Sequence, residues 1–331
     1  MLERVEYGFG WLRRLRRGTL GANETSIAVG RTSMRLPGRA GWWALAAVVC
    51  AAGVSVSSPT SEASTGALVL RVRIFRFVDD SRTIRLPDGR RVPRLVETVV
   101  RYPVVGNAYP LVVFGHGYTL TPATYARLLR AWTEAGYVVA APVFPLENAA
   151  APGGPNESDL INQPEDMSFV ITRLLALNAR ANGVLYRRID SSRIAVAGHS
   201  DGAETALAVA YDKRFRDPRV GAAIVLSGAA LPGMGAFPRN GPALLAVQGT
   251  ADTINSPATS AGFFRRAQRP KFLLWLLGAL HLPPYTDQQP QLGIVEQATT
   301  AFLDHYLKGR PLGALDQAAR RPGLTRLAAA P

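Results

Sequence analysis

The chain has 331 residues, of which 47% are hydrophobic and 19% charged, so its composition is that of a globular protein with room for one sizeable core. Its formal net charge of +14 comes almost wholly from scattered arginines, without the basic stretches interleaved with aromatic residues that single-strand binders use. We therefore expect no nucleic acid as a partner, although a cationic surface would favour an anionic lipid or polymer.

The first 60 residues have the features of a targeting segment. Residues 1–33 are a basic extension without apolar periodicity, and Met34 would be a normal start for a signal, which suggests a mis-assigned start. Residues 41–56 are apolar, follow two arginines and precede small residues, as in a secretion signal. The run is shorter than the about 20 residues of a membrane span. Residues 34–60 are therefore predicted to be a signal peptide or an uncleaved N-terminal anchor, which places the protein outside the cytoplasm, either secreted or associated with the membrane through this segment.

The remaining chain predicts two strands followed by alternating strands and helices. Residues 68–78 alternate apolar and arginine side chains, which is typical of an edge strand, and Asp88-Gly89 favours a hairpin turn before a strand at 91–102. The later strands are expected at 111–114, 138–144, 194–197, 220–226, 244–247 and 272–277, and the helices at 122–135, 164–178, 203–212, 257–268 and 293–308. This order predicts an α/β fold with a mostly parallel sheet, helices on both faces and no large cap domain. Residues 311–331 are expected to be a loose C-terminal tail.

Residues 194–202 predict a buried strand that ends in Gly-x-Ser-x-Gly and runs directly into an alanine-rich helix. This is the context of a nucleophile elbow, in which a tight turn lifts the serine oxygen above the sheet. Gly198 and Gly202 are expected to provide space, because a side chain at either position would collide with a neighbouring element. We therefore predict Ser200 as a nucleophile, preceded in the elbow by His199. The alternative is a chance match in a glycine-rich turn.

A serine nucleophile needs a base, and the base needs an acid that orients it. In the chain order Ser, Asp, His, the candidates are Asp252 and His281, each of which follows a predicted strand. Both would then lie at the carboxyl edge of a parallel sheet, where catalytic groups gather. The alternatives are a turn or cap role for Asp252 and an ordinary loop position for His281.

The loop after the strand at 111–114 is the expected oxyanion loop. The backbone amides of Tyr118 and Asp201 are predicted to form the oxyanion hole, and His116, Gly117 and Tyr118 are candidates for lining the substrate. The amide of Gly117 is expected to turn towards the oxyanion as well. The side chain of Asp201 is expected to be a solvent-facing carboxylate at a helix N-terminus, with exclusion of anionic substrates as the alternative.

Together these segments resemble the α/β-hydrolase superfamily, in the group that contains dienelactone hydrolase-like, chlorophyllase-like and cutinase-type polyester hydrolases. The matching pieces lie at 113–118, 163–170, 198–202, 249–254 and 279–285, and the resemblance spans about residues 95–310. It implies an α/β-hydrolase catalytic domain, which we place at 61–310.

The chain also departs from these relatives. Asp201 stands where bacterial polyester hydrolases usually carry Met, and the loop at 227–232 lacks their Trp. With a single cysteine, their C-terminal disulfide cannot form, and the cysteine nucleophile of dienelactone hydrolase is absent. A serine esterase is therefore favoured.

We accordingly predict a monomeric secreted serine hydrolase, similar to carboxylesterases, lipases and cutinases, that needs no metal or cofactor. A triad of Ser200, His281 and Asp252 would cleave a small acyl ester, a lipid or a polyester through an acyl-enzyme. A peptidase or amidase with the same triad is one alternative. A non-catalytic binding protein of the same fold is the other.

Overall fold

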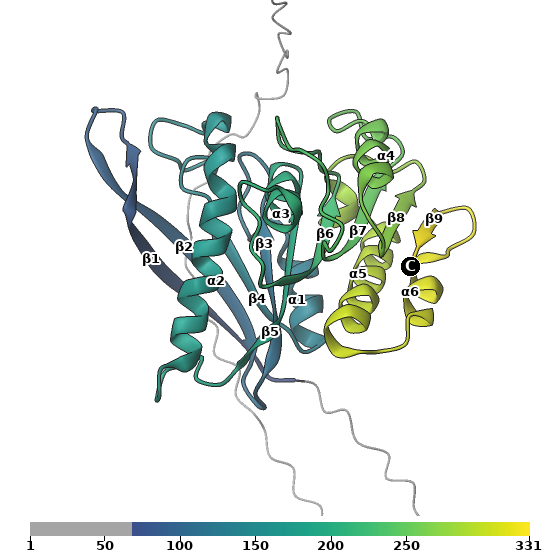
Figure 1. Ribbon diagram of the computed structural model, residues 1–331, viewed down its shortest axis with the longest axis horizontal. Helices are drawn as coiled ribbons and strands as arrows, with labels where there is room; N and C mark the ends of the chain where they lie inside the picture. Colours follow the sequence, from purple (N-terminus) through teal and green to yellow (C-terminus); the bar gives the residue numbers. More distant parts are fainter. Residues whose placement is uncertain (1–67) are drawn as a thin grey trace, which may run out of the picture. The chain divides into compact units, whose positions relative to one another are not determined.

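The computed structural model describes residues 68–331, so the predicted extension at 1–33 and the signal or anchor at 34–60 lie outside the described residues. Nine strands in the described part form one sheet in the order β1-β2-β4-β3-β5-β6-β7-β8-β9 (Figure 1). The strands are β1 (Leu70–Arg85), β2 (Arg91–Pro103), β3 (Tyr109–Gly115), β4 (Val138–Val143), β5 (Ile189–His199), β6 (Val220–Leu226), β7 (Ala243–Gly249), β8 (Lys271–Leu276) and β9 (Thr325–Ala330). The helices are α1 (Ala126–Glu134), α2 (Gln163–Ala179), α3 (Asp201–Tyr211), α4 (Pro257–Arg266), α5 (Gln291–Lys308) and α6 (Gly313–Ala319), with short 3-10 turns η1 (Glu157–Asn162) and η2 (Pro283–Tyr285).

The six strands from β4 to β8 in the sheet order are parallel, which confirms the predicted mostly parallel sheet. β1 lies at the edge of the sheet and pairs with β2 in an antiparallel hairpin, and β2 pairs antiparallel with β4. The central strands are apolar and buried on both faces, as strands covered by helices on two sides must be. No helix within residues 68–331 combines the length and the apolarity needed to cross a membrane.

Successive side chains of each central strand point to opposite faces of the sheet and enter two separate cores. On β3, Val113 packs in the core that α2, α3 and α4 cover, whereas Val112 packs in the core that α1, α5 and α6 cover. Figure 1 shows α2 and α3 in front of the sheet. The sheet is therefore held from both sides, and its carboxyl edge is where the loops after β3, β5, β7 and β8 meet.

The prediction of a loose tail at 311–331 is wrong. This segment forms α6 and then β9, which pairs antiparallel with the outer edge of β8 and extends the folded domain beyond residue 310. Leu315 and Ala319 are buried against the core under α5. An unpaired β8 would present a free hydrogen-bonding edge, and β9 covers it. The strand was hard to predict because Ala328–Ala330 are weak strand formers whose pairing depends on the neighbour.

A buried arginine ties the edge strands to the start of α2. Arg94 of β2 donates from Nη1 and Nη2 to Asp159 of η1, and from Nε and Nη2 to Asp166 of α2, over 2.5–3.0 Å. All three side chains are buried. Asp166 also accepts from Arg82 of β1 over 2.8 Å. This network fixes η1 and the first turn of α2 beside the carboxyl edge of the sheet.

We expect Arg94→Leu to lower the free energy of unfolding by about 3–5 kcal/mol, because it leaves the buried Asp159 without a counter-charge and Asp166 with Arg82 alone. Urea unfolding of the full chain, followed by circular dichroism, measures the loss. Arg130→Leu is the matched control, since Arg130 is exposed and pairs only with Glu134 on the surface of α1. Equal stability of the two variants would contradict this account of the network.

Candidate active site

Ser200 occupies a sharp turn between β5 and α3. Its backbone has φ 54° and ψ −122°, a conformation that costs a residue with a side chain about 1–3 kcal/mol. Hydrogen bonds on both sides hold it there: the Ser200 amide donates to the Leu226 carbonyl, and the Ser200 carbonyl accepts from the amides of Ala203 and Glu204. These hydrogen bonds therefore attach the strained turn both to the sheet, at β6, and to the first turn of α3.

Two glycines flanking Ser200 make this turn possible. A Cβ on Gly198 would lie 2.0 Å from the Gly202 carbonyl oxygen, and a Cβ on Gly202 would lie 2.2 Å from the backbone of Gly115. No side chain fits at such distances, so α3 can begin this close to β3 and β5 only with glycine at both positions. The serine oxygen is then raised above the ends of these strands.

The structure brings together the three side chains that the sequence singled out. The Ser200 hydroxyl lies 3.0 Å from Nε2 of His281, and Nδ1 of His281 lies 2.8 Å from Oδ2 of Asp252. Asp252 follows β7 and His281 follows β8. The geometry is that of a nucleophile, a base and an acid that orients the base.

Asp252 is held as an ionised acceptor. Burial acts to raise the pKa of Asp252, but hydrogen bonds from His281 and its neighbours outweigh it and bring the pKa below its ordinary value. Oδ1 accepts from the amides of Ile254 and Asn255, and Oδ2 accepts from Nε2 of Gln248 over 3.0 Å. An ionised Asp252 requires Nδ1 of His281 to carry the proton, which leaves Nε2 free to accept from the serine.

The two amides expected to bind an oxyanion face no competing acceptor. Within residues 68–331, neither the amide of Tyr118 nor that of Asp201 donates a hydrogen bond to another protein group. Tyr118 lies on the loop after β3, and Asp201 is the first residue of α3, where the helix leaves its amides unpaired. The amide of Gly117, in contrast, is already engaged, because it donates to the Tyr125 hydroxyl over 3.2 Å.

The expectation that His116 lines the substrate is wrong, because this side chain is fully buried. Gly117 is buried too, but a Cβ there would lie 3.2 Å from the Ser200 Cβ, so its backbone borders the serine. The Phe144 amide donates to Nε2 of His116 over 3.0 Å, so the proton is on Nδ1, which donates to the Gly117 carbonyl over 2.9 Å. Burial lowers the pKa of His116 to about 4, so the ring is neutral. Its role is to fix the loop after β3 against the end of β4, and Gly117 and the half-buried Tyr118 stay candidates for lining the substrate.

The side chain of Asp201 also differs from its expectation. It is only 8% exposed and does not face solvent. Oδ1 lies 3.4 Å from the Ser200 hydroxyl oxygen, and Oδ2 has no hydrogen-bond partner. Burial, followed by the repulsion from Glu157, raises the pKa of Asp201 to about 6. The carboxyl group of Asp201 therefore borders the Ser200 hydroxyl directly.

A chain of hydrogen bonds that sequence reasoning missed joins the oxyanion loop to the loop of His281. Tyr125 accepts from the Gly117 amide, and its hydroxyl lies 2.7 Å from Nδ1 of His199. Nε2 of His199 lies 2.9 Å from the His281 carbonyl. Because an amide can only donate and a carbonyl only accept, the Tyr125 proton must point at Nδ1 and the His199 proton must be on Nε2. Burial, followed by the charge of His281, lowers the pKa of His199 to about 3, so one neutral tautomer is held.

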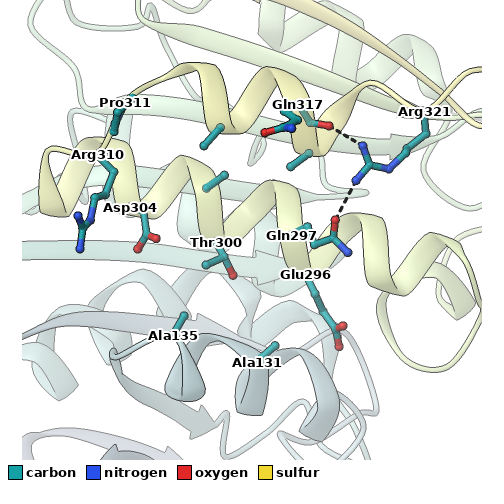
Figure 2. Close-up of a pocket in the computed structure, with 13 residues that line it drawn as sticks. Ala131, Ala135, Glu296, Gln297, Thr300, Asp304, Arg310, Pro311, Gln317 and Arg321 are labelled. Carbon is teal, nitrogen blue, oxygen red and sulfur yellow. Dashed lines mark hydrogen bonds between the residues drawn. The ribbon is translucent and has the colours of Figure 1, made fainter. Parts of the chain in front are cut away.

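A separate cavity of about 830 Å³ lies between α1, α5 and α6, on the face of the sheet opposite to α3 (Figure 2). Its walls combine alanines with a few polar side chains, among them Glu296, Asp304 and Arg321. Arg321 donates to the Gln317 carbonyl and to Oε1 of Gln297, the two bonds drawn in Figure 2. None of the lining residues belongs to the group around Ser200, so this cavity is not part of the candidate active site.

The sheet order, the serine elbow after β5 and the acid and histidine after β7 and β8 are those of a hydrolase of the α/β-hydrolase class. A comparison with family models supports this class: the chlorophyllase model matches residues 85–262, just over half of the chain. The chain belongs to the chlorophyllase family. The matched residues include Ser200 and Asp252 and end before His281. No curated protein matches the chain.

We expect Tyr125→Phe to lower the free energy of unfolding by about 1–3 kcal/mol, because it leaves the buried Gly117 amide and Nδ1 of His199 without partners. Thermal and urea unfolding of the full chain measure the change. Tyr186→Phe is the control, since Tyr186 is exposed and takes part in none of these hydrogen bonds. If both variants unfold alike, the hydroxyl does not link the two loops.

Proposed function

We propose that the protein is a serine hydrolase that cleaves carboxylic esters through an acyl-enzyme. The proposal rests on one observation, the hydrogen-bonded series of Ser200, His281 and Asp252 at a strained strand-to-helix turn. The Ser200 hydroxyl lies 3.0 Å from His281, and His281 lies 2.8 Å from Asp252. Membership of the chlorophyllase family supports ester chemistry for this site. The proposal needs no metal or cofactor.

The proposed mechanism begins with attack of the Ser200 oxygen on the ester carbonyl while Nε2 of His281 takes the hydroxyl proton. Asp252 holds the imidazole and stabilises the imidazolium. The tetrahedral oxyanion accepts from the amides of Tyr118 and Asp201, and removal of one such donor typically costs about 100- to 1,000-fold in kcat. The intermediate collapses, and the alcohol leaves with the proton from His281. Water, deprotonated by His281, then releases the acid and restores the serine.

The strained turn and the neutral His199 tautomer both support this mechanism physically. The site holds its donors and its base in place before substrate arrives, so little reorganisation is needed when charge develops. The series of hydrogen bonds through Tyr125 holds the loop of His281 at a fixed position relative to the loop of Tyr118. We therefore propose His199 and Tyr125 as positioning residues, which touch neither substrate nor the reacting atoms.

Ser200→Ala is expected to reduce turnover of p-nitrophenyl butyrate by about 10³-fold or more and to abolish labelling by a fluorophosphonate probe, because the nucleophile is gone. The urea unfolding midpoint should stay close to that of the wild type. Ser192→Ala, which removes an exposed serine hydroxyl, is the matched control and should change neither readout.

Retained labelling or turnover in Ser200→Ala would overturn the assignment. Labelling of the wild type without ester turnover would instead indicate an amidase or peptidase with the same triad. Absence of both signals in the folded wild type would favour a non-catalytic binding protein.

We also propose that the enzyme is a monomer that works outside the cytoplasm, secreted or anchored through residues 34–60. The apolar run at 41–56 with its flanking arginines and small residues supports this location. When the full chain is expressed in a bacterial host, the mature protein is expected in the medium, in the periplasm or on the membrane. Mass spectrometry of the N-terminus of the protein in each of these fractions shows its location and whether the signal is cleaved, and sedimentation gives its oligomeric state. A cytoplasmic protein with an intact N-terminus would contradict the proposal.

A further inference from the structure

Buried carboxylates in this protein are normally paired with a basic side chain. In the described part of the chain, the paired ones are Asp79 with Arg82, Asp159 and Asp166 with Arg94, Asp212 with Arg214, Asp217 with Arg219, and Asp252 with His281. Two buried carboxylates of residues 68–331, Glu147 and Asp201, form no ion pair with a basic side chain. Both belong to the surroundings of Ser200.

Their unpaired oxygens lie at the nucleophile and at the oxyanion loop. Asp201 approaches the Ser200 oxygen to 3.4 Å, and its Oδ2 has no partner. Glu147 is fully buried without an ion-pair partner, and the neutral side-chain amide of Gln163 is the donor that acts to lower its pKa. Its carbonyl accepts from the amide of Thr119, the residue after Tyr118. A buried polar group without a partner is rare and requires an explanation.

Two further carboxylates complete the group. Glu157 is exposed on η1, and Glu204 is half-buried one turn after Asp201 on α3. Burial, followed by the charge of Asp201, raises the pKa of Glu204 to about 8 and the pKa of Glu147 to about 9. With these pKa values, Glu147 is largely protonated at pH 8 and Glu204 about half ionised, so Asp201 is the buried carboxyl of the group that is charged. Within residues 68–331 no arginine or lysine forms an ion pair with any of the four side chains.

This absence of counter-charge contrasts with the rest of the chain. The sequence has 38 basic residues against 24 acidic ones, so basic side chains are plentiful. A buried carboxylate without a partner destabilises the folded protein. Such a cost is expected where a ligand, and not the protein, supplies the opposite charge.

We propose that the carboxylate of Asp201, with Glu157 and Glu204 near it, forms a subsite for a positively charged ammonium group of the ester substrate. The inference rests on the proposed esterase function and names its substrate class. Tyr118 precedes Thr119, whose amide donates to the Glu147 carbonyl, so it lies on the loop beside this group. Its half-buried ring offers a face on which an ammonium group is attracted as well.

The test compares matched thioesters that differ only in charge. The cationic substrate is butyrylthiocholine, and the neutral one replaces its quaternary nitrogen by carbon, S-(3,3-dimethylbutyl) thiobutyrate. Both release a thiol that a colorimetric reagent detects, and both are measured at pH 8 on the full chain. We expect kcat/KM of the wild type to be about tenfold higher for the cationic thioester, which corresponds to about 1.4 kcal/mol.

Three variants locate the effect. Asp201→Asn removes the charge beside the nucleophile while keeping the shape of the side chain, and it should bring the ratio of the two kcat/KM values close to one. Glu157→Gln removes an exposed charge of the same group without touching Ser200, and it should lower the ratio about threefold, as loss of one partly screened charge would. Asp316→Asn, an exposed carboxylate on α6 paired with Arg320, is the control and should leave the ratio unchanged.

A wild-type ratio near one, or a ratio that survives both Asp201→Asn and Glu157→Gln, would overturn the inference and leave the esterase proposal standing. A folded wild type that hydrolyses neither thioester nor p-nitrophenyl butyrate, and that no fluorophosphonate labels, would overturn the esterase proposal and the inference with it. The two failures are therefore distinguishable by the neutral ester alone.

Discussion

The close approach of three backbone segments at Gly115, Gly198 and Gly202 is the constraint on which the site depends. The start of α3 contacts the ends of β3 and β5 at distances that leave no room for a Cβ. This contact forces Ser200 into a backbone conformation that a residue with a side chain rarely adopts. The strain persists because the surrounding sheet and helix stabilise each other independently of it. The raised position of the Ser200 hydroxyl is thus a consequence of how tightly the core elements pack.

The positions of the other groups follow from the same sheet. Parallel strands end at one edge, so the loops after β3, β5, β7 and β8 are neighbours although they are far apart in sequence. Packing alone would leave these loops free to shift relative to one another by fractions of an ångström. The hydrogen bonds from Gly117 through Tyr125 and His199 to His281 restrict that freedom, because each proton in the series has only one possible direction.

The sequence was sufficient for those parts of the site that depend on local patterns and on chain order. Ser200 lies in a short motif with a required context, and Asp252 and His281 follow strands that their apolar runs reveal. Burial and side-chain pairing across the fold were not accessible in this way. Nothing near His116 or Asp201 in the sequence indicates that other segments cover them, and Tyr125 is one aromatic among several in a predicted helix. The C-terminal strand was missed for the same reason, since β9 exists by pairing with β8 and not by its own propensity.

The net charge of the whole chain is a poor guide to the charge near Ser200. A net charge of +14 describes the whole chain and directs attention to anionic partners. At Ser200, however, the buried Asp201 carboxyl lies 3.4 Å from the serine oxygen and has no basic partner, while arginines pair with other buried carboxylates. Near a buried carboxylate the effective dielectric is lower than in water, so this near charge outweighs distant surface arginines that salt screens. What the site attracts is therefore decided within a few ångströms of the nucleophile, and for that reason the side chain after Ser200 is more informative about the substrate than the composition of the protein.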